Sequence, residues 1–152
     1  MKKLIALIIV SLLLEGIVWA IPTDRTIIKD YTMAVEKAVF FLSKDGKDKA
    51  FAAVNDPKGE FAKLQNGLFV YVIDLKGEIL SHSSNKLLIG QRFFDIRDAD
   101  GKLFYQEIIK EATQKGSGWV TYKVLDPISK RTERKECYFK KSGDYIVACA
   151  VK

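Results

Sequence analysis

The sequence is poor in the residues from which catalytic and metal sites are usually built. It has one histidine, His82, and two cysteines, Cys137 and Cys149, in 152 residues. A structural zinc site takes about four cysteine or histidine ligands, and a histidine base needs a nucleophile and an orienting carboxylate beside it. The composition therefore argues against a metal centre, and it leaves His82 as the histidine whose role must be decided.

The sequence also lacks an apolar run long enough to span a membrane. Its longest run covers residues 4–14, whereas a membrane helix takes about 20 apolar residues. Lys2 and Lys3 precede this run, and a small residue, Ala20, follows it. A charged start, a short apolar centre and a small-residue site are typical of a secretory signal peptide. We therefore expect cleavage after Ala20 and a periplasmic or secreted protein, with an uncleaved N-terminal membrane anchor as the alternative.

Long blocks of one charge are missing as well. The chain has 25 lysines and arginines against 19 acidic residues, a formal charge of +6. Removing residues 1–20, with two lysines and one glutamate, would lower it to +5. Clusters such as residues 44–49 mix both signs, which is typical of a solvated face. Nucleic-acid binding usually needs a basic stripe, so we expect no nucleic-acid partner, and the positive charge favours a small anionic one.

Apolar periodicity predicts an α+β domain over residues 21–152. Offsets of three and four indicate one long helix from residue 26 to about 53, broken near Gly46, and a shorter helix near 103–113. Alternating β-rich runs bounded by turn residues indicate five strands, at residues 68–73, 78–83, 119–125, 133–140 and 145–151.

The order of these elements predicts an antiparallel five-stranded sheet with the long helix on one face. Residues 83–118, between the second and third strands, form a segment too long for an idle loop in a compact domain. We expect this helix-containing crossover to cover the other face of the sheet. A covered sheet is a place where a small ligand can bind.

Several segments resemble a known family. They are "VYVIDLKGEILSH", "NKLLIGQRFFDIRDADGKLFYQEIIKEA", "GSGWVTYKVLDP" and "KECYFKKSGDYIVACAV", preceded by "AVEKAVFFLSKDGKDKAFAAVNDPKGEF". Together they cover roughly residues 35–151 and are similar to the single-Cache extracellular sensor domain of type 2. The resemblance implies a PAS-like fold with a ligand pocket under the crossover. It also implies sensing of small molecules, often short organic anions, outside the inner membrane.

Members of the resembled family are commonly attached to chemoreceptors of chemotaxis or to histidine kinases. The present sequence ends at Lys152 without a second membrane helix or an output domain. The expectation is therefore a free-standing sensor that passes its signal to a partner, such as a membrane receptor or histidine kinase. The sequence departs from the family at two places. It has Ser81-His82-Ser83 where the family has Ala-His-Pro, and Lys152 where the family has its last tyrosine. These departures leave the identity of the ligand open.

The resemblance and the strand pattern together give six candidate ligand-binding residues. A lysine in a central strand is costly to bury without an anionic partner, so Lys135 is the candidate for a ligand carboxylate. The aromatic candidates fit a core role equally well. A one-residue slip of register would reverse the face of each side chain, so Lys135 and Tyr138 need not share a face. The full set is Tyr71, His82, Trp119, Tyr122, Lys135 and Tyr138.

Three functions remain open from the residues alone. His82 at the end of a strand favours a pocket residue in a binding module that needs no cofactor and is not an enzyme. A small hydrolase using His82 with Ser81 or Ser83 is the less favoured alternative, because no nucleophile motif accompanies them. A partner-binding structural module with a closed pocket is the third.

The two cysteines lie in the last two predicted strands. If residues 142–144 form a three-residue loop, Cys137 falls directly opposite Cys149. Opposed residues of an antiparallel pair lie about 4.5–5.5 Å apart, within reach of a disulfide. We therefore expect a Cys137–Cys149 bridge in an oxidising compartment, with two buried free thiols as the alternative.

Overall fold

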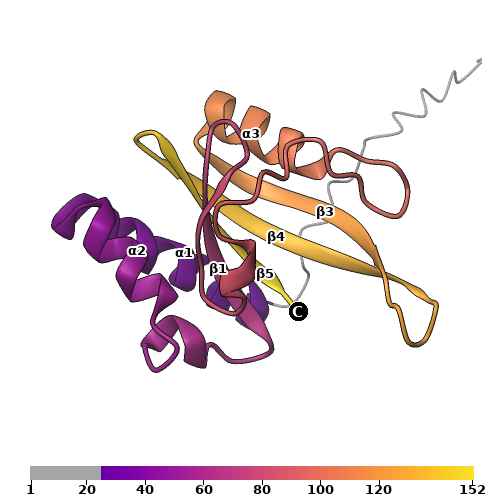
Figure 1. Ribbon diagram of the computed structural model, residues 1–152, viewed down its shortest axis with the longest axis horizontal. Coiled ribbons are helices and arrows are strands. Elements are labelled where there is room, and N and C mark those ends of the chain that lie inside the picture. The colour runs from indigo at the N-terminus through magenta and orange to yellow at the C-terminus, as the bar shows by residue number, and fades with distance from the viewer. Residues whose placement is uncertain (1–24) are drawn as a thin grey trace, which may run out of the picture.

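The computed structural model describes residues 25–152, so the predicted signal peptide lies outside the described residues. The α+β prediction is confirmed, and Figure 1 shows the helices and the sheet. Two short 3₁₀ helices, η1 and η2, were not predicted. The helices are α1 (Arg25–Asp45), α2 (Lys47–Asn55), η1 (Glu60–Lys63), η2 (Lys86–Leu88) and α3 (Phe104–Lys115). The strands are β1 (Leu68–Asp74), β2 (Ile79–His82), β3 (Ser117–Leu125), β4 (Thr132–Ser142) and β5 (Tyr145–Val151).

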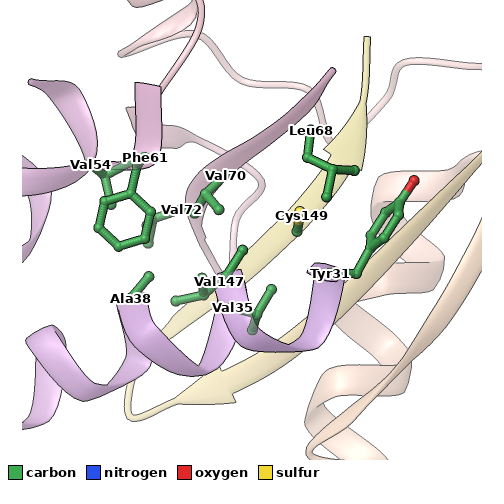
Figure 2. Close-up of a cluster of buried hydrophobic side chains, with 11 residues drawn as sticks. Tyr31, Val35, Ala38, Val54, Phe61, Leu68, Val70, Val72, Val147 and Cys149 are labelled. Atoms are coloured by element: carbon green, nitrogen blue, oxygen red, sulfur yellow. The ribbon is translucent and has the colours of Figure 1, made fainter. Parts of the chain in front are cut away.

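The five strands form one antiparallel sheet in the order β2-β1-β5-β4-β3. Because side chains alternate across a strand, the sheet presents two different surfaces. We call the surface that packs on α1 and α2 the helix face, and its core residues appear in Figure 2. We call the surface under α3 the covered face. The sheet and α3 together bury Tyr71, Ile73, Ile79, Ile108, Ala112, Val120, Cys137, Phe139, Ile146, Ala148 and Ala150 there, of which Ile108 and Ala112 belong to α3.

The long helix predicted from periodicity divides where the sequence indicated. Gly46 has a φ of 82°, a left-handed conformation that glycine adopts without steric cost. The chain turns there and continues as α2. Tyr31, Val35 and Ala38 of α1 are buried against the helix face, which fixes this layer to the sheet.

The crossover between β2 and α3 is attached to both edges of the sheet. At the β2 edge, the Phe93 N–H donates to the Gly77 carbonyl at 2.8 Å. At the β3 edge, the Ala99 N–H donates to the Lys123 carbonyl, and the Lys123 N–H donates to Asp98 Oδ2, both at 2.9 Å. The segment therefore spans the covered face from edge to edge, as the sequence predicted.

The predicted disulfide is not formed, because the final hairpin has a different register. Its turn contains two residues, Gly143 and Asp144, instead of three, and Gly143 has a φ of 58°. Cys137 is consequently opposite Ala150, while Cys149 is opposite Tyr138. The one-residue shift places the two thiols on opposite faces of the sheet. Both cysteines are free and buried.

Within residues 25–152, none of the helices is both long enough and apolar enough to cross a bilayer. The same residues contain no group of three acidic, histidine or cysteine side chains suited to holding a metal ion.

Candidate functional site

Four of the six predicted site residues lie on the covered face. Tyr71 of β1 is directly opposite His82 of β2, and Tyr122 of β3 is directly opposite Lys135 of β4. Directly opposed residues of an antiparallel pair project to the same side of the sheet. Lys135 shares its face with Cys137, two residues along β4, whose thiol lies 3.5 Å from the Tyr71 hydroxyl. The four residues thus form one candidate site built by four strands.

The candidate site is enclosed largely by aromatic rings. Phe69 stacks on His82 with ring centroids 4.9 Å apart, and Phe104 stacks on Tyr122 at 4.4 Å. Tyr105 of α3 lies 6.1 Å from Tyr71. Stacked rings provide apolar surface with a fixed geometry, so the surroundings of the candidate site are mainly apolar.

The phenylalanines and Tyr105 of this enclosure were missed as site residues. Phe93 lies in the crossover and Tyr105 in α3, and their ring centroids are 5.5 Å apart. Only the tertiary fold places these two rings over the sheet. The clustering of four aromatic residues at 93, 94, 104 and 105 was the available signal.

The surroundings of His82 determine its tautomer and lower its pKa. Its Nδ1 accepts the backbone N–H groups of Ser84 and Asn85 at 3.2 and 3.0 Å, so the proton of the neutral ring is on Nε2. Burial, and then the positive charge of Lys152, lower the pKa of His82 to about 4. His82 is therefore a neutral donor near pH 7 and not a general base.

This pKa has a measurable effect on stability. Between pH 6.5 and 4 the unfolded chain binds a proton at His82 and the folded chain does not, so the free energy of unfolding should fall as the pH falls through this window. We expect a loss of about 3 kcal/mol between pH 7.5 and 4. His82→Asn should lose correspondingly less stability over the same pH range. Urea unfolding of both proteins checks this, and equal pH dependence in the two would contradict it.

The tyrosine and cysteine groups of the site are uncharged. Burial raises the pKa of Tyr71 well above its usual value and raises that of Cys137 to about 12. Burial likewise raises the pKa values of Tyr105 and Tyr122. The hydroxyls can therefore donate hydrogen bonds to an anion, while the Cys137 thiol is not a nucleophile near pH 7.

Lys135 gives the site its positive charge. Its side chain is 15% exposed, and its Nζ lies 3.0 Å from Glu133 Oε2 and 2.6 Å from the Lys152 backbone oxygen. The Glu133 side chain is about half exposed, so water competes with Lys135 for its carboxylate. The present pairing is therefore weak enough for another anion to replace Glu133.

Trp119 and Tyr138 lie on the opposite surface of the sheet from the other four candidates. They are directly paired across β3 and β4, and their rings are 5.1 Å apart. Trp119 also packs against Tyr31 of α1 at 5.3 Å. Their position on the helix face does not fit the ligand-binding role expected for them, and the odd spacing between Lys135 and Tyr138 is the reason.

The serines beside His82 have structural hydrogen bonds. Ser81 Oγ donates to the Phe51 carbonyl at 3.2 Å and to Asn55 Oδ1 at 2.9 Å. Ser83 Oγ accepts the Val70 N–H at 3.0 Å. Because Nδ1 of His82 is already bonded to two backbone N–H groups, it activates neither hydroxyl. The geometry gives no support to the serine–histidine alternative.

Asn55 holds the strand that carries His82. Its Oδ1 accepts both the Ser81 hydroxyl and the His82 N–H at 2.9 Å. Asn55 is the last residue of α2, so this bond joins the helix layer to β2. The sequence showed Asn55 only as part of a turn, since its partners lie 26 and 27 residues away.

The comparisons with known proteins agree with this architecture. The model of the single Cache domain 2 family matches residues 23–147. No curated protein is a significant match. A Cache chemosensory domain studied for carboxylic acid recognition has 20% identity and a TM-score of 0.65, over 84% of this chain and 93% of that one.

Two further solved structures have the same fold. A periplasmic sensor domain of a chemotaxis protein has 21% identity and a TM-score of 0.61, over 84% of this chain and 90% of that one. A methyl-accepting chemotaxis protein from Vibrio parahaemolyticus has 16% identity and a TM-score of 0.62, over 83% and 88%. Since the family model spans the helix layer, most of the sheet and the covering crossover, the chain belongs to the single Cache domain 2 family of sensor domains.

Proposed function

We propose that the protein is an exported sensor module that binds a small organic anion on the covered face. In this proposal residues 1–20 direct export to the periplasm or the exterior, which N-terminal sequencing of the exported protein checks. The ligand signal passes to a partner of the membrane-receptor or histidine-kinase kind. The protein performs no chemistry on its ligand.

The position of Lys135 is the observation that carries the proposal. An ammonium group is costly to remove from water unless an anion pairs with it. Lys135 is mostly buried, yet its acidic partner Glu133 lies on the exposed part of the same strand. A ligand carboxylate that displaced Glu133 would pair with Lys135 in a less hydrated place, where charge-assisted hydrogen bonds are stronger.

The surrounding groups suit the rest of such a ligand. His82 and the hydroxyls of Tyr71 and Tyr122 are neutral donors on the same face. The rings of Phe69 and Phe104 supply apolar surface. A small acid with one carboxylate and an apolar or aromatic part would place its carboxylate at Lys135 and the neutral donors, and its apolar part against the rings. Carboxylic acid recognition by a neighbour of the same fold supports the choice of ligand class.

A thermal-shift screen tests the proposed function. A ligand that binds only the folded state must raise the melting temperature by mass action. We expect some small carboxylic acids to raise it at millimolar concentration, and the corresponding carboxamides, which are neutral and of the same size, to leave it unchanged. If no acid shifts the melting temperature, the partner-binding module with a closed pocket is the better reading.

A further inference from the structure

The β3–β4 hairpin extends beyond the rest of the sheet. β4 pairs with β5 only from Cys137 onward, whereas its pairing with β3 continues to Leu125 opposite Thr132. The five residue pairs between these limits, from Thr121–Glu136 to Leu125–Thr132, therefore form a two-stranded ribbon. At about 3.4 Å per residue the ribbon is roughly 17 Å long. Figure 1 shows it projecting past the C-terminal end of β5.

The tip of this ribbon is an ordered turn that exposes an apolar side chain. Asp126 Oδ1 accepts the N–H groups of Ile128 and Ser129, both at 2.7 Å, and the Asp126 carbonyl accepts the Lys130 N–H at 3.0 Å. Ile128 is 92% exposed and Leu125 is 55% exposed. Turn tips usually carry glycine, asparagine, aspartate or serine. Val124 is 40% exposed as well, so three apolar side chains of the hairpin face solvent.

Two basic side chains lie at the apolar tip, and three more lie along the ribbon, where each is ion-paired with an acidic residue. Residues 123–135 contain five lysines and arginines and two acidic residues. One of the acids, Asp126, accepts two N–H groups of the turn, which lower its pKa and keep it charged. Lys130 and Arg131 are exposed on the tip beside Ile128. The hairpin thus presents apolar and positive groups together.

The base of the hairpin lies beside the first turns of α1. Ile27 and Tyr31 of α1, Arg134 and Glu136 of β4, and Val151 of β5 line one shallow depression of about 350 Å³. The hairpin therefore projects at the end of the domain where α1 begins and β5 ends. A chain held near a bilayer by this end would present the tip of the hairpin to the same bilayer.

We propose that the β3–β4 hairpin is a contact site for an anionic phospholipid surface, with Ile128 entering the headgroup region and Lys130 and Arg131 pairing with lipid phosphates. An anionic bilayer offers negative charge and an apolar layer just beneath it. Basic residues near such a surface gain from its potential, and an apolar side chain gains by leaving water. An acidic protein surface would complement only the charges.

Site-specific labelling of the full chain, as an exporting host produces it, tests the proposal. Ile128→Cys carries a polarity-sensitive thiol dye, and Leu87→Cys is the matched control, since Leu87 is 82% exposed on η2. Cys137 and Cys149 are buried and remain unlabelled in the folded protein. We expect a blue shift at position 128, and none at 87, with phosphatidylcholine vesicles containing one-third phosphatidylglycerol. Pure phosphatidylcholine should give little shift, and high salt should reduce the response.

Charge variants in the labelled background complete the test. Lys130→Gln with Arg131→Gln should lower the apparent vesicle affinity about 30-fold. Lys47→Gln with Lys49→Gln, equal in charge but placed on α2, should leave it unchanged. The proposal is overturned if position 128 does not respond, if both positions respond alike, or if the two double variants behave alike. Binding of the hairpin to poly-glutamate but not to vesicles would also overturn it, in favour of an acidic protein partner.

Discussion

Replacement of Lys135 by methionine is expected to weaken binding of a carboxylate ligand by about 100-fold, since truncating one partner of a buried charge pair costs about 2–5 kcal/mol. Methionine fills a similar volume and leaves the apolar contacts of the stem in place. The fold should survive, because the Glu133 carboxylate that loses its partner is about half exposed and stays hydrated. Titration calorimetry with an acid found by the thermal-shift screen measures the change.

Lys140→Met is the matched control for this experiment. Lys140 belongs to the same strand but lies on the helix face, where its Nζ is 2.8 Å from both oxygens of Glu36. Its loss should leave ligand affinity unchanged. If Lys135→Met retains full affinity while the acid still binds, the carboxylate lies elsewhere on the protein, and the assignment of Lys135 is incorrect.

Gly77→Ala is expected to lower the free energy of unfolding by about 3 kcal/mol. Gly77 has a φ of 80°, where any other L-residue costs about 1–2 kcal/mol. A Cβ at this position would also lie 3.0 Å from the Phe94 backbone nitrogen, and backbone cannot move aside as a flexible side chain can. The substitution would push the crossover away from β2, where the Phe93 N–H bonds to the Gly77 carbonyl.

Gly90→Ala separates the two contributions. Gly90 has a φ of 83°, but a Cβ there would meet no atom within 4 Å. It should show the conformational cost alone, about 1–2 kcal/mol. Urea unfolding of both variants measures the difference, and hydrogen exchange at the Phe93 amide reports whether the crossover has loosened. Equal losses in the two variants would show that the close approach at Phe94 does not matter.

Features set by local patterns were predictable from the sequence. The helix break at Gly46 depends on one glycine with a φ of 82°, and the strands follow from alternating apolar residues, so both appear where expected. The position of the crossover over the sheet followed from its length. These elements depend on near neighbours in the chain, for which periodicity is a direct signal.

Features set by register were not predictable. Whether Cys149 faces Cys137 depends on whether the turn before it has two residues or three, and Ser142-Gly143-Asp144 is compatible with both. The same kind of information decides that Lys135 lies on the covered face and Tyr138 on the helix face. In the candidate site, Tyr105 and Asn55 were missed because their contacts are made across the tertiary structure.

The separated thiols have a consequence for how the domain can be handled and where it can fold. With Cys137 and Cys149 on opposite sides of the sheet, the native state contains no covalent bond that a reductant could break. The raised pKa values of both buried thiols, caused by burial, also keep them protonated and slow to oxidise. Folding should therefore be indifferent to redox potential, so the domain can be produced in a reducing cytoplasm as readily as in an oxidising compartment.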